Sequence, residues 1–465
     1  MTDKPDYRSV MASVDRDGRR KWIYAAIVPG VWRRRRTIVS NLLIVFYLAL
    51  PFLTIGGEPV LRFDLAQKCY VILGFTFWPQ DFFFLLLGVL AFFMFTLLLV
   101  SLLGRVFCGW LCPHNVFLEG VFRRLETWWE GPAHKRRLAD AKHPWPLGLV
   151  GRKLGKWMCY LLAVGAMANT ATALFIGPDD FIGGIIVDPF KHPSAAVFFA
   201  VFFAVNLFNF AWFREQTCTI VCPYGRWQAA MLDADTIGVT YDFVRGEPRG
   251  KKGTVTGDCV DCFQCVQVCP TGIDIRDGNQ LECIHCTACI DACDAVMTKI
   301  DRPLGLIRYT SENAVQGKPL RLLRPRGAIY AAALSVIIVI AAVRLGARTD
   351  ILTTRLRDSA APTVELTTNG DAMVRQQIHV ALLNRSRQQR EVTISLPDSL
   401  DAEVFLQHPR LTLAPNERQE QTAIVRILKS RFAVGQHGRR QLSTEIVVAD
   451  DRGETTRLPL QLEAP

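Results

Sequence analysis

Eight cysteines in one short stretch constrain this chain more than any other feature. They form two runs between residues 259 and 293, and each run has the spacing C-x2-C-x2-C-x3-C. The runs contain Cys259, Cys262, Cys265 and Cys269, then Cys283, Cys286, Cys289 and Cys293. In proteins with two 4Fe–4S clusters, three close cysteines hold one cluster and the fourth reaches the other. Soft thiolate ligands suit the iron of such clusters, so the spacing predicts two 4Fe–4S clusters.

Zinc sites or disulfides are the alternative use of so many cysteines. Zinc modules usually pair C-x2-C half-sites across a longer spacer, which differs from four closely spaced cysteines. The fourteen cysteines of the chain therefore predict reduced thiols and a module that faces the cytoplasm, rather than a secreted disulfide scaffold.

The composition indicates a membrane protein. Half of the 465 residues are hydrophobic, and the formal net charge is +11. In a membrane protein, such a basic balance reflects Lys and Arg in cytoplasmic loops, so nucleic acid is not an expected partner. The first forty residues are strongly charged, and no cleavable signal peptide is expected.

Apolar runs predict about five membrane spans. They cover residues 38–55, with Pro51 inside, then 82–103, 157–176, 195–213 and 328–343. Each approaches the roughly 20 residues that cross a bilayer core. Lys and Arg gather before the first span, in 122–156 and in 321–326, so these segments are expected in the cytoplasm. The expected location is a bacterial inner membrane, with the C-terminal part in the periplasm.

Residues 350–465 differ from the rest because short alternating apolar runs replace the long ones. Strands are expected at 363–366, 378–383, 392–396, 404–406, 423–427 and 445–448. Turn residues at 369–370, 397–398 and 415–416 punctuate them. This pattern predicts an antiparallel β-sandwich.

The predicted fold class is a polytopic α-helical membrane protein with an inserted α+β ferredoxin-like domain and a C-terminal all-β sandwich. The expected domains are a cytoplasmic basic segment (1–37), a four-span membrane domain (38–225), a cytoplasmic ferredoxin-like domain (226–320), a fifth membrane helix (321–346) and a periplasmic sandwich (347–465).

Four more cysteines form two copies of the motif C-x3-C-P. Cys108 and Cys112 follow the second span, and Cys218 and Cys222 follow the fourth. A spacing of four residues places two thiols on one helix face. Four thiols from two such motifs could converge on one metal, and soft thiolates select Cu(I), zinc or a third iron–sulfur cluster. We interpret these four cysteines as a metal-binding or redox site, with copper as the first candidate.

Other polar and sulfur-containing residues are assigned smaller roles. Cys159 lies in the third span and is expected to pack, and Cys69 is given no role. His114 follows the first C-x3-C-P motif and is expected to be an ordinary boundary histidine. His285 is expected to tune its neighbouring cluster through hydrogen bonds. The charged stretch with Glu119, Glu126 and Glu130 indicates a solvated amphipathic helix.

Motifs along nearly the whole chain resemble the cytochrome c oxidase accessory protein family known as CcoG, RdxA or FixG. They are FWPQDF (77–82), GRVFCGWLCP (104–113), FREQTCTIVCPYGRWQAAMLD (213–233), YDFVRGEPRG (241–250), the cysteine block (257–294), PLGLIRY (303–309) and RPRGAIY (324–330). The C-terminal sandwich resembles the immunoglobulin-like domain that ends this family.

The resemblance implies a role for each cysteine. Cys259, Cys262, Cys265 and Cys293 would hold one cluster, and Cys283, Cys286, Cys289 and Cys269 the other. Cys108, Cys112, Cys218 and Cys222 would form the copper or electron-transfer site. His114 stands where the family often has glutamine, which argues against a ligand role.

The resemblance also implies a function: an iron–sulfur cupric reductase that reduces Cu(II) to Cu(I) for assembly of cbb3-type cytochrome c oxidase. The expected partners are copper ions, copper chaperones or transporters, oxidase assembly factors and the lipid bilayer, and a homodimer is left open. One alternative is a quinol-linked electron-transfer protein. Another is an oxidase assembly scaffold without enzymatic activity.

Overall fold

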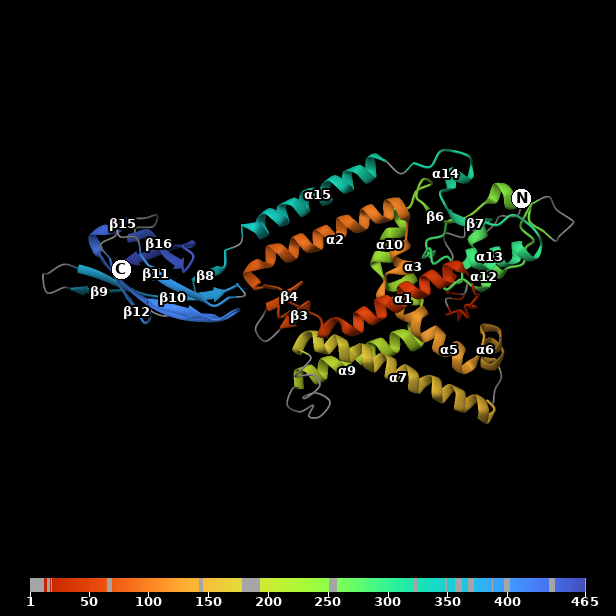
Figure 1. Ribbon diagram of the computed structural model, residues 1–465, viewed down its shortest axis with the longest axis horizontal. Coiled ribbons are helices and arrows are strands. Elements are labelled where there is room, and N and C mark those ends of the chain that lie inside the picture. Colours follow the sequence, from red (N-terminus) through yellow and green to blue (C-terminus); the bar gives the residue numbers. More distant parts are fainter. Residues whose placement is uncertain are drawn as a thin grey trace. The chain divides into compact units, whose positions relative to one another are not determined.

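The computed structural model describes residues 12–14, 17, 19–64, 69–141, 145–177, 193–250, 257–321, 324–347, 349–355, 362–366, 372–386, 388–396, 402–434 and 440–464. The chain divides into two compact units, Met1–Val339 and Ile340–Pro465. Figure 1 labels the elements of each unit. The turn residues predicted at 369–370 and 397–398 lie outside the described residues, whereas Asn416 lies in a turn as expected.

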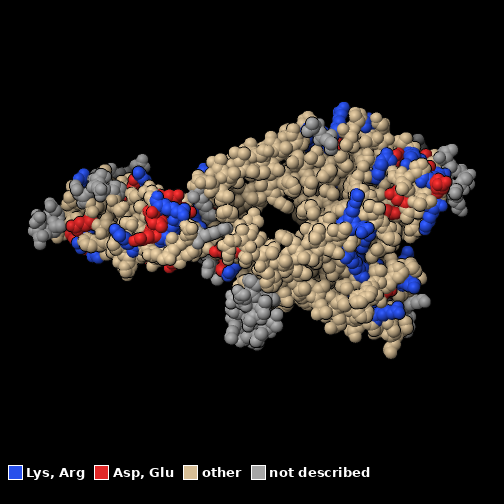
Figure 2. Space-filling model, viewed as in Figure 1, with Lys and Arg blue, Asp and Glu red and all other residues tan. Residues whose placement is uncertain are grey.

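Five of the described helices are long and apolar enough to cross a membrane, as predicted. They span Val31–Phe52, Phe82–Leu103, Leu147–Ile176, Pro193–Phe213 and Pro325–Gly346. The chain is therefore a multi-pass membrane protein. Figure 2 shows that the displayed faces of α1 (Val31–Ala49), α2 (Phe82–Leu103), α7 (Leu147–Ile176) and α9 (Pro193–Phe208) are almost free of charge. Charged side chains gather instead at the beginning of α1 and around α13 (Ala288–Lys299).

The helix bounds differ from the predicted spans, most clearly at the third span and at Pro51. α7 begins about ten residues before the predicted third span, and its first turns contain Arg152 and Lys153. Pro51 lies in a short 3-10 turn, Leu50–Phe52, rather than inside the first helix. The proline ring cannot continue an α-helix, so α1 ends at Ala49.

The segment between α1 and α2 folds into short strands, which the apolar pattern did not predict. The strands are β1 (Thr54–Ile55), β2 (Glu58–Pro59), β3 (Leu61–Asp64), β4 (Cys69–Ile72) and β5 (Phe75–Phe77). β3, β4 and β5 form an antiparallel sheet, and β1 pairs with β2.

Short helices follow the second and fourth spans and position the C-x3-C-P motifs. After α2 come α3 (Val106–Trp110), α4 (Pro113–Phe117), α5 (Arg123–Glu130) and α6 (Ala133–Asp140). After α9 come two wide π-helical turns, Asn209–Phe213 and Thr217–Val221, and then α10 (Pro223–Ala230).

The cysteine-rich region is enclosed by two strands that are far apart in sequence. β6 (Gly238–Tyr241) pairs antiparallel with β7 (Ile307–Thr310), and α12 (Gln264–Gln267) and α13 lie between them in the chain. Short helices α11 (Phe243–Gly246) and α14 (Glu312–Val315) flank the strands, and α15 (Pro325–Gly346) follows. The buried core of this region combines residues of β6 and β7 with cysteines of both runs.

The C-terminal unit consists of two antiparallel sheets. One contains β12 (Glu403–Leu406), β14 (Arg418–Leu428), β10 (Ala372–Asn384) and β8 (Ile351–Arg355) in that order, with β9 (Thr363–Leu366) also on β10. The other contains β13 (Arg410–Leu413), β11 (Arg390–Ser395), β16 (Arg440–Asp450) and β15 (Ala433–Val434), with β17 (Thr455–Ala464) on β16. Alternate apolar residues of both sheets share one core, so the two sheets pack against each other.

Candidate functional site

The first candidate cluster site is a cavity beside β6 and α13. Four cysteines line it: Cys259, Cys262, Cys265 and Cys293. Cys262 is exposed, and the other three are buried. The remaining lining is largely apolar, apart from Arg276. Four soft donors around one enclosed space fit a 4Fe–4S cluster.

The second candidate cluster site is a cavity next to the first. It is lined by Cys269, Cys283, Cys286 and Cys289, and Cys265 lines both cavities. The fourth cysteine of each run thus lies with the first three cysteines of the other run. Cys269 lines the second cavity, and Cys293 lines the first. The structure brings the eight cysteines together in the two sets that the sequence predicts.

A repeated backbone conformation positions the two cysteine runs. Asp261 and Phe263 have φ angles of 54° and 59°, and His285 and Thr287, in the same places of the second run, have 52° and 67°. These left-handed residues turn the chain around the middle cysteine of each run. α12 and α13 begin directly after them.

Burial raises the pKa of Cys265, Cys283 and Cys293 to about 12. This value includes the charges of neighbouring cysteines, which act in the same direction as burial. Thiols in such surroundings stay protonated at neutral pH unless a cation replaces the proton. The two cavities are therefore suited to a bound metal cluster rather than to free thiolates.

The two C-x3-C-P motifs converge, as predicted. Cys108, Cys112, Cys218 and Cys222, called here the thiol quartet, lie close enough for charge on one thiol to affect the next. Burial raises the pKa of Cys108 and Cys112, and charge on Cys222 raises it further. The pKa of Cys218 is raised even more strongly by burial and then by the other three thiols. A soft cation bound to the thiol quartet would remove the repulsion between the negative charges of its thiolates.

Both motifs share one backbone arrangement, which differs from the single helix face expected for them. The amide of Cys112 donates to the carbonyl of Phe107 at 2.8 Å, and that of Cys222 donates to Thr217 at 2.8 Å. Each motif therefore makes a wide turn, and a new helix begins at the following proline. The reason is that proline cannot donate a helical hydrogen bond but is well suited to the first position of a helix.

Polar groups around the quartet were not singled out by the sequence. The thiol of Cys108 donates to Oε1 of the fully buried Gln228 at 3.0 Å, and the amide of Gly225 lies 3.4 Å from Sγ of Cys222. Nη2 of Arg105 lies 3.9 Å from Sγ of Cys108. Its positive charge opposes the effect of burial on the pKa of Cys108. Arg105 could have been singled out in the sequence because it lies three residues before Cys108, the first cysteine of the motif.

The thiol quartet lies next to the second cluster cavity. Cys108, Ile284 and Cys286 form one buried cluster. A β-carbon on Gly109 would overlap the carbonyl oxygen of Ile284 and lie 3.1 Å from Cα of Cys286. Glycine at 109 therefore permits the close approach of the two backbones.

Two histidines near these sites already have hydrogen-bond partners. Nε2 of His114 lies 3.0 Å from the backbone carbonyl of Arg214, and Nδ1 lies 3.1 Å from the side-chain Nδ2 of Asn209. Both ring nitrogens are used, which agrees with the expectation that His114 is not a ligand. Nδ1 of His285 accepts from the amide of Arg105 at 3.1 Å, so this ring joins the cysteine-rich region to the chain before the first motif.

The helix expected to be solvated is instead buried in a network of ion pairs. Glu126 pairs with Arg214 at 2.5 Å and also with Arg136, and Tyr160 donates to it at 2.9 Å. Glu130 pairs with Lys156 at 2.8 Å. The expectation for Glu119, Glu126 and Glu130 was wrong because each carboxylate is compensated by basic side chains, which are arginines for Glu119 and Glu126 and lysines for Glu130.

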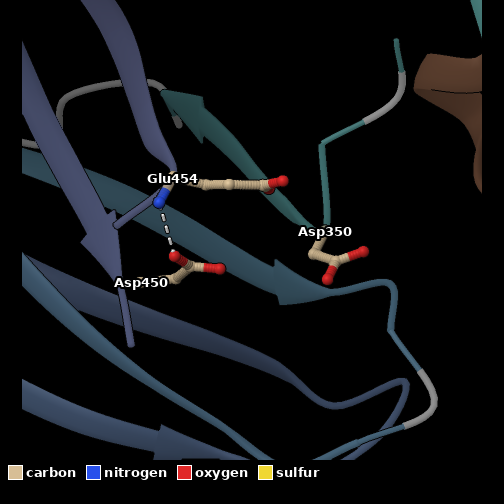
Figure 3. Close-up of side chains that lie close together, drawn as sticks. All are labelled: Asp350, Asp450 and Glu454. Atoms are coloured by element: carbon tan, nitrogen blue, oxygen red, sulfur yellow. Dashed lines mark hydrogen bonds between the residues drawn. The ribbon is translucent and has the colours of Figure 1, made fainter. Parts of the chain in front are cut away.

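The remaining cysteines and one acidic cluster do not line the two cluster cavities or belong to the thiol quartet. Cys69 is buried in β4, and Cys159 accepts a hydrogen bond from Nε1 of Trp129 at 3.3 Å. In the C-terminal unit, carboxylates of Asp350, Asp450 and Glu454 lie within 4.8 Å of one another (Figure 3). Arg390 lies 2.5 Å from Asp350 and compensates its charge, so this group is a structural ion-pair cluster.

Comparison with known proteins supports the iron–sulfur interpretation. Residues 213–312 match the family model of a 4Fe-4S dicluster domain, and residues 85–132 match that of a 4Fe-4S binding domain. Protein RdxB from Cereibacter sphaeroides is 34% identical over 436 residues, which cover 88% of this chain and 89% of RdxB. Protein RdxA from the same organism is 32% identical over 398 residues, 81% of this chain and 82% of RdxA.

The chain belongs to the FixG/RdxA family. Nitrogen fixation protein FixG from Rhizobium meliloti is 36% identical over 306 residues, which cover 63% of this chain and 58% of FixG. As a FixG/RdxA member with matches to 4Fe-4S domains and five apolar helices, the protein is a membrane iron–sulfur redox protein.

Proposed function

We propose that this chain is a cupric reductase that transfers single electrons to Cu(II) at the thiol quartet and releases Cu(I) for assembly of cbb3-type cytochrome c oxidase. The single observation that carries the proposal is the contact between the quartet and the second cluster cavity. Cys108 shares a buried cluster with Cys286, and Gly109 lies against the same backbone. A donor and an acceptor placed so close need no further carrier between them.

The eight cysteines of the two cavities would hold the clusters. In this proposal, Cys259, Cys262, Cys265 and Cys293 bind the first, and Cys269, Cys283, Cys286 and Cys289 bind the second. When bound, the clusters supply one-electron storage at two adjacent places. Cys262 is exposed, so reduction by an external partner is expected beside the first cavity, whereas Cys286 lies towards the quartet.

The quartet residues would bind copper as substrate. Cu(II) gains one electron and becomes Cu(I), and the electron comes from a reduced iron–sulfur centre of this chain. Thiolates favour the softer Cu(I), so Cys108, Cys112, Cys218 and Cys222 would stabilise the product. Arg105 would offset part of the negative charge of the thiolates, and Gln228 would orient Cys108.

The topology and partners belong to the same proposal. The N-terminal segment and the cysteine-rich region would face the cytoplasm of a bacterium, and the C-terminal sandwich, with an immunoglobulin-like fold, would lie in the periplasm. Lys and Arg close to the spans favour this orientation. Copper chaperones or transporters and oxidase assembly factors would be the partners that supply and receive copper.

A third iron–sulfur cluster at the quartet is the second candidate. The match of residues 85–132 to a 4Fe-4S binding domain favours it, because this range contains Cys108 and Cys112. Anaerobic purification followed by metal analysis separates the two. Copper reduction predicts about eight irons per chain with copper bound on addition, whereas a third cluster predicts about twelve irons.

Paired substitution tests the role of the quartet. In the variant Cys108→Ser with Cys218→Ser, we expect the iron content to stay near eight per chain and cupric reduction to be lost. Cys159→Ser is the matched control, because Cys159 lies in α7 outside the quartet. Unchanged copper binding and reduction in the double variant would refute the proposal.

A further inference from the structure

A cavity rich in arginine lies beside the second cluster cavity. Cys286 lines one side of it. Arg33 and Arg36 of α1 line it together with Arg123 and Glu119, and residues 25–28 cover another side. We call it the arginine pocket. The thiol quartet contributes no residue to its lining.

The charges that line the arginine pocket do not balance. Three guanidinium groups face one carboxylate. Glu119 makes its close ion pair with Arg123, so the nearest guanidinium nitrogens of Arg33 and Arg36 remain 3.8 and 4.0 Å from it. The positive charge of Arg123 is further compensated by Glu215, whose Oε2 lies 3.3 Å from Nη2 of Arg123. The excess positive charge therefore lies on Arg33 and Arg36.

Arg36 is the side chain that most needs another partner. Its side chain is 5% exposed, and its Nε donates to the carbonyl of Gly109 at 3.0 Å. Its buried Nη2 has no hydrogen-bond partner among the described residues. A buried donor without a partner is costly, and more so when it carries charge. This observation, independent of the charge count, points to a missing anion.

We propose that the arginine pocket binds a phosphate-type oxyanion, held by Arg36 and Arg33. A guanidinium group presents two parallel N–H donors that match the spacing of phosphate oxygens. Val268, Ala288 and residues 25–28 line the rest of the pocket and favour a small group. The phosphate is either a free ion or the headgroup of an anionic lipid, since α1 enters the membrane from this end.

The pocket could instead serve only to neutralise the cysteine thiolates, because Cys286 interacts electrostatically with Arg33. The two explanations differ in a measurable way. Neutralisation alone requires no bound anion, whereas the proposal requires saturable binding that depends on Arg36.

Equilibrium dialysis with radiolabelled inorganic phosphate tests the proposal on the full-length protein, purified anaerobically into nanodiscs of phosphatidylcholine. We expect saturable binding in the wild type and binding about tenfold weaker in Arg36→Gln, the effect of one lost charge-assisted contact. Arg34→Gln is the matched control, because Arg34 is an exposed residue of the same helix. Its phosphate binding should equal that of the wild type.

Iron content and the cluster spectrum verify that each variant is folded. If Arg36→Gln loses iron, Arg36→Lys replaces it, because it keeps the charge but lacks the paired donors; weaker phosphate binding is again expected. Nanodiscs with phosphatidylglycerol distinguish the two sources: loss of phosphate binding there identifies a lipid headgroup, and retention identifies the free ion. Absence of saturable binding in the wild type, or binding unaffected by the Arg36 variants, would overturn the proposal.

Discussion

Gly109 lies so close to Cys286 that a β-carbon at position 109 would be 3.1 Å from Cα of Cys286. The two residues belong to different motifs, since Gly109 lies within the first C-x3-C-P motif and Cys286 within the second ferredoxin run. Their contact connects the thiol quartet with the second cluster cavity. A substitution that separates these two backbones should therefore slow cupric reduction while the iron content stays unchanged.

Gly109→Ala tests this contact directly. The added methyl group would overlap the Ile284 carbonyl and push the two backbones apart, at a cost of about 1–3 kcal/mol in stability. We expect the iron content to remain unchanged and the rate of cupric reduction to fall. Gly88→Ala is the control, because a β-carbon there meets nothing within 4 Å. Equal reduction rates in both variants would contradict the role of the contact.

The crossed arrangement of the cysteine runs predicts the effect of Cys293→Ser. Cys293 is the last cysteine of the second run but lines the first cavity. The variant should lose the cluster of the first cavity and keep that of the second, so iron should fall from about eight to about four per chain. Spectroscopy should show that the remaining cluster is the one lost in Cys289→Ser. If both variants lose the same cluster, the assignment is wrong.

Asp291 supplies the N-terminal cap of α1 from a distant part of the chain. Its carboxylate accepts from the amides of Trp32 at 3.1 Å and Arg33 at 2.6 Å, where Gly30 offers no side chain. Asp291→Ala should lower the free energy of unfolding by about 1 kcal/mol, whereas Asp291→Asn, which keeps an acceptor oxygen, should lose less. Thermal unfolding in detergent measures both. Equal losses in the two variants would argue against a capping role.

The lowered pKa of Glu126 predicts that the protein loses stability in acid. Burial alone would raise the pKa of Glu126, but Arg214 and Arg136 outweigh it and hold the pKa at about 2, below the ordinary value of 4.5. The folded state thus binds the proton less readily than the unfolded state. The stabilisation is complete above pH 4.5 and is lost as the pH falls towards about 2.

The variant Glu126→Gln isolates this contribution. It should be less stable than the wild type at neutral pH, because it leaves buried arginines without a countercharge. Its unfolding temperature should also fall less between neutral pH and about pH 3, since the titrating group is gone. An acid dependence identical to that of the wild type would show that Glu126 does not contribute.

Local patterns predicted much of the fold and of the site. The five apolar helices and the two sets of cluster cysteines follow from composition and spacing. The predicted strand at 363–366 coincides with β9, and the other five lie within or overlap observed strands. These features were predictable because each depends on a period or a spacing within a short segment.

Features that depend on distant partners were not predictable. Glu126 seemed solvated because Arg214, its partner, is far away in the sequence. Asp291 caps a helix that begins more than two hundred residues earlier.

Strand β17 was missed for a local reason. Pro459 interrupts its alternating pattern, although an edge strand tolerates proline.

The central claim is that one electron passes from the iron–sulfur centres of this chain to copper at the thiol quartet. The most direct measurement is electron paramagnetic resonance on anaerobically reduced protein, freed of reductant and mixed with an equal amount of Cu(II). We predict that the Cu(II) signal disappears while an equal number of reduced clusters becomes oxidised. A Cu(II) signal that persists beside fully reduced clusters would contradict the claim.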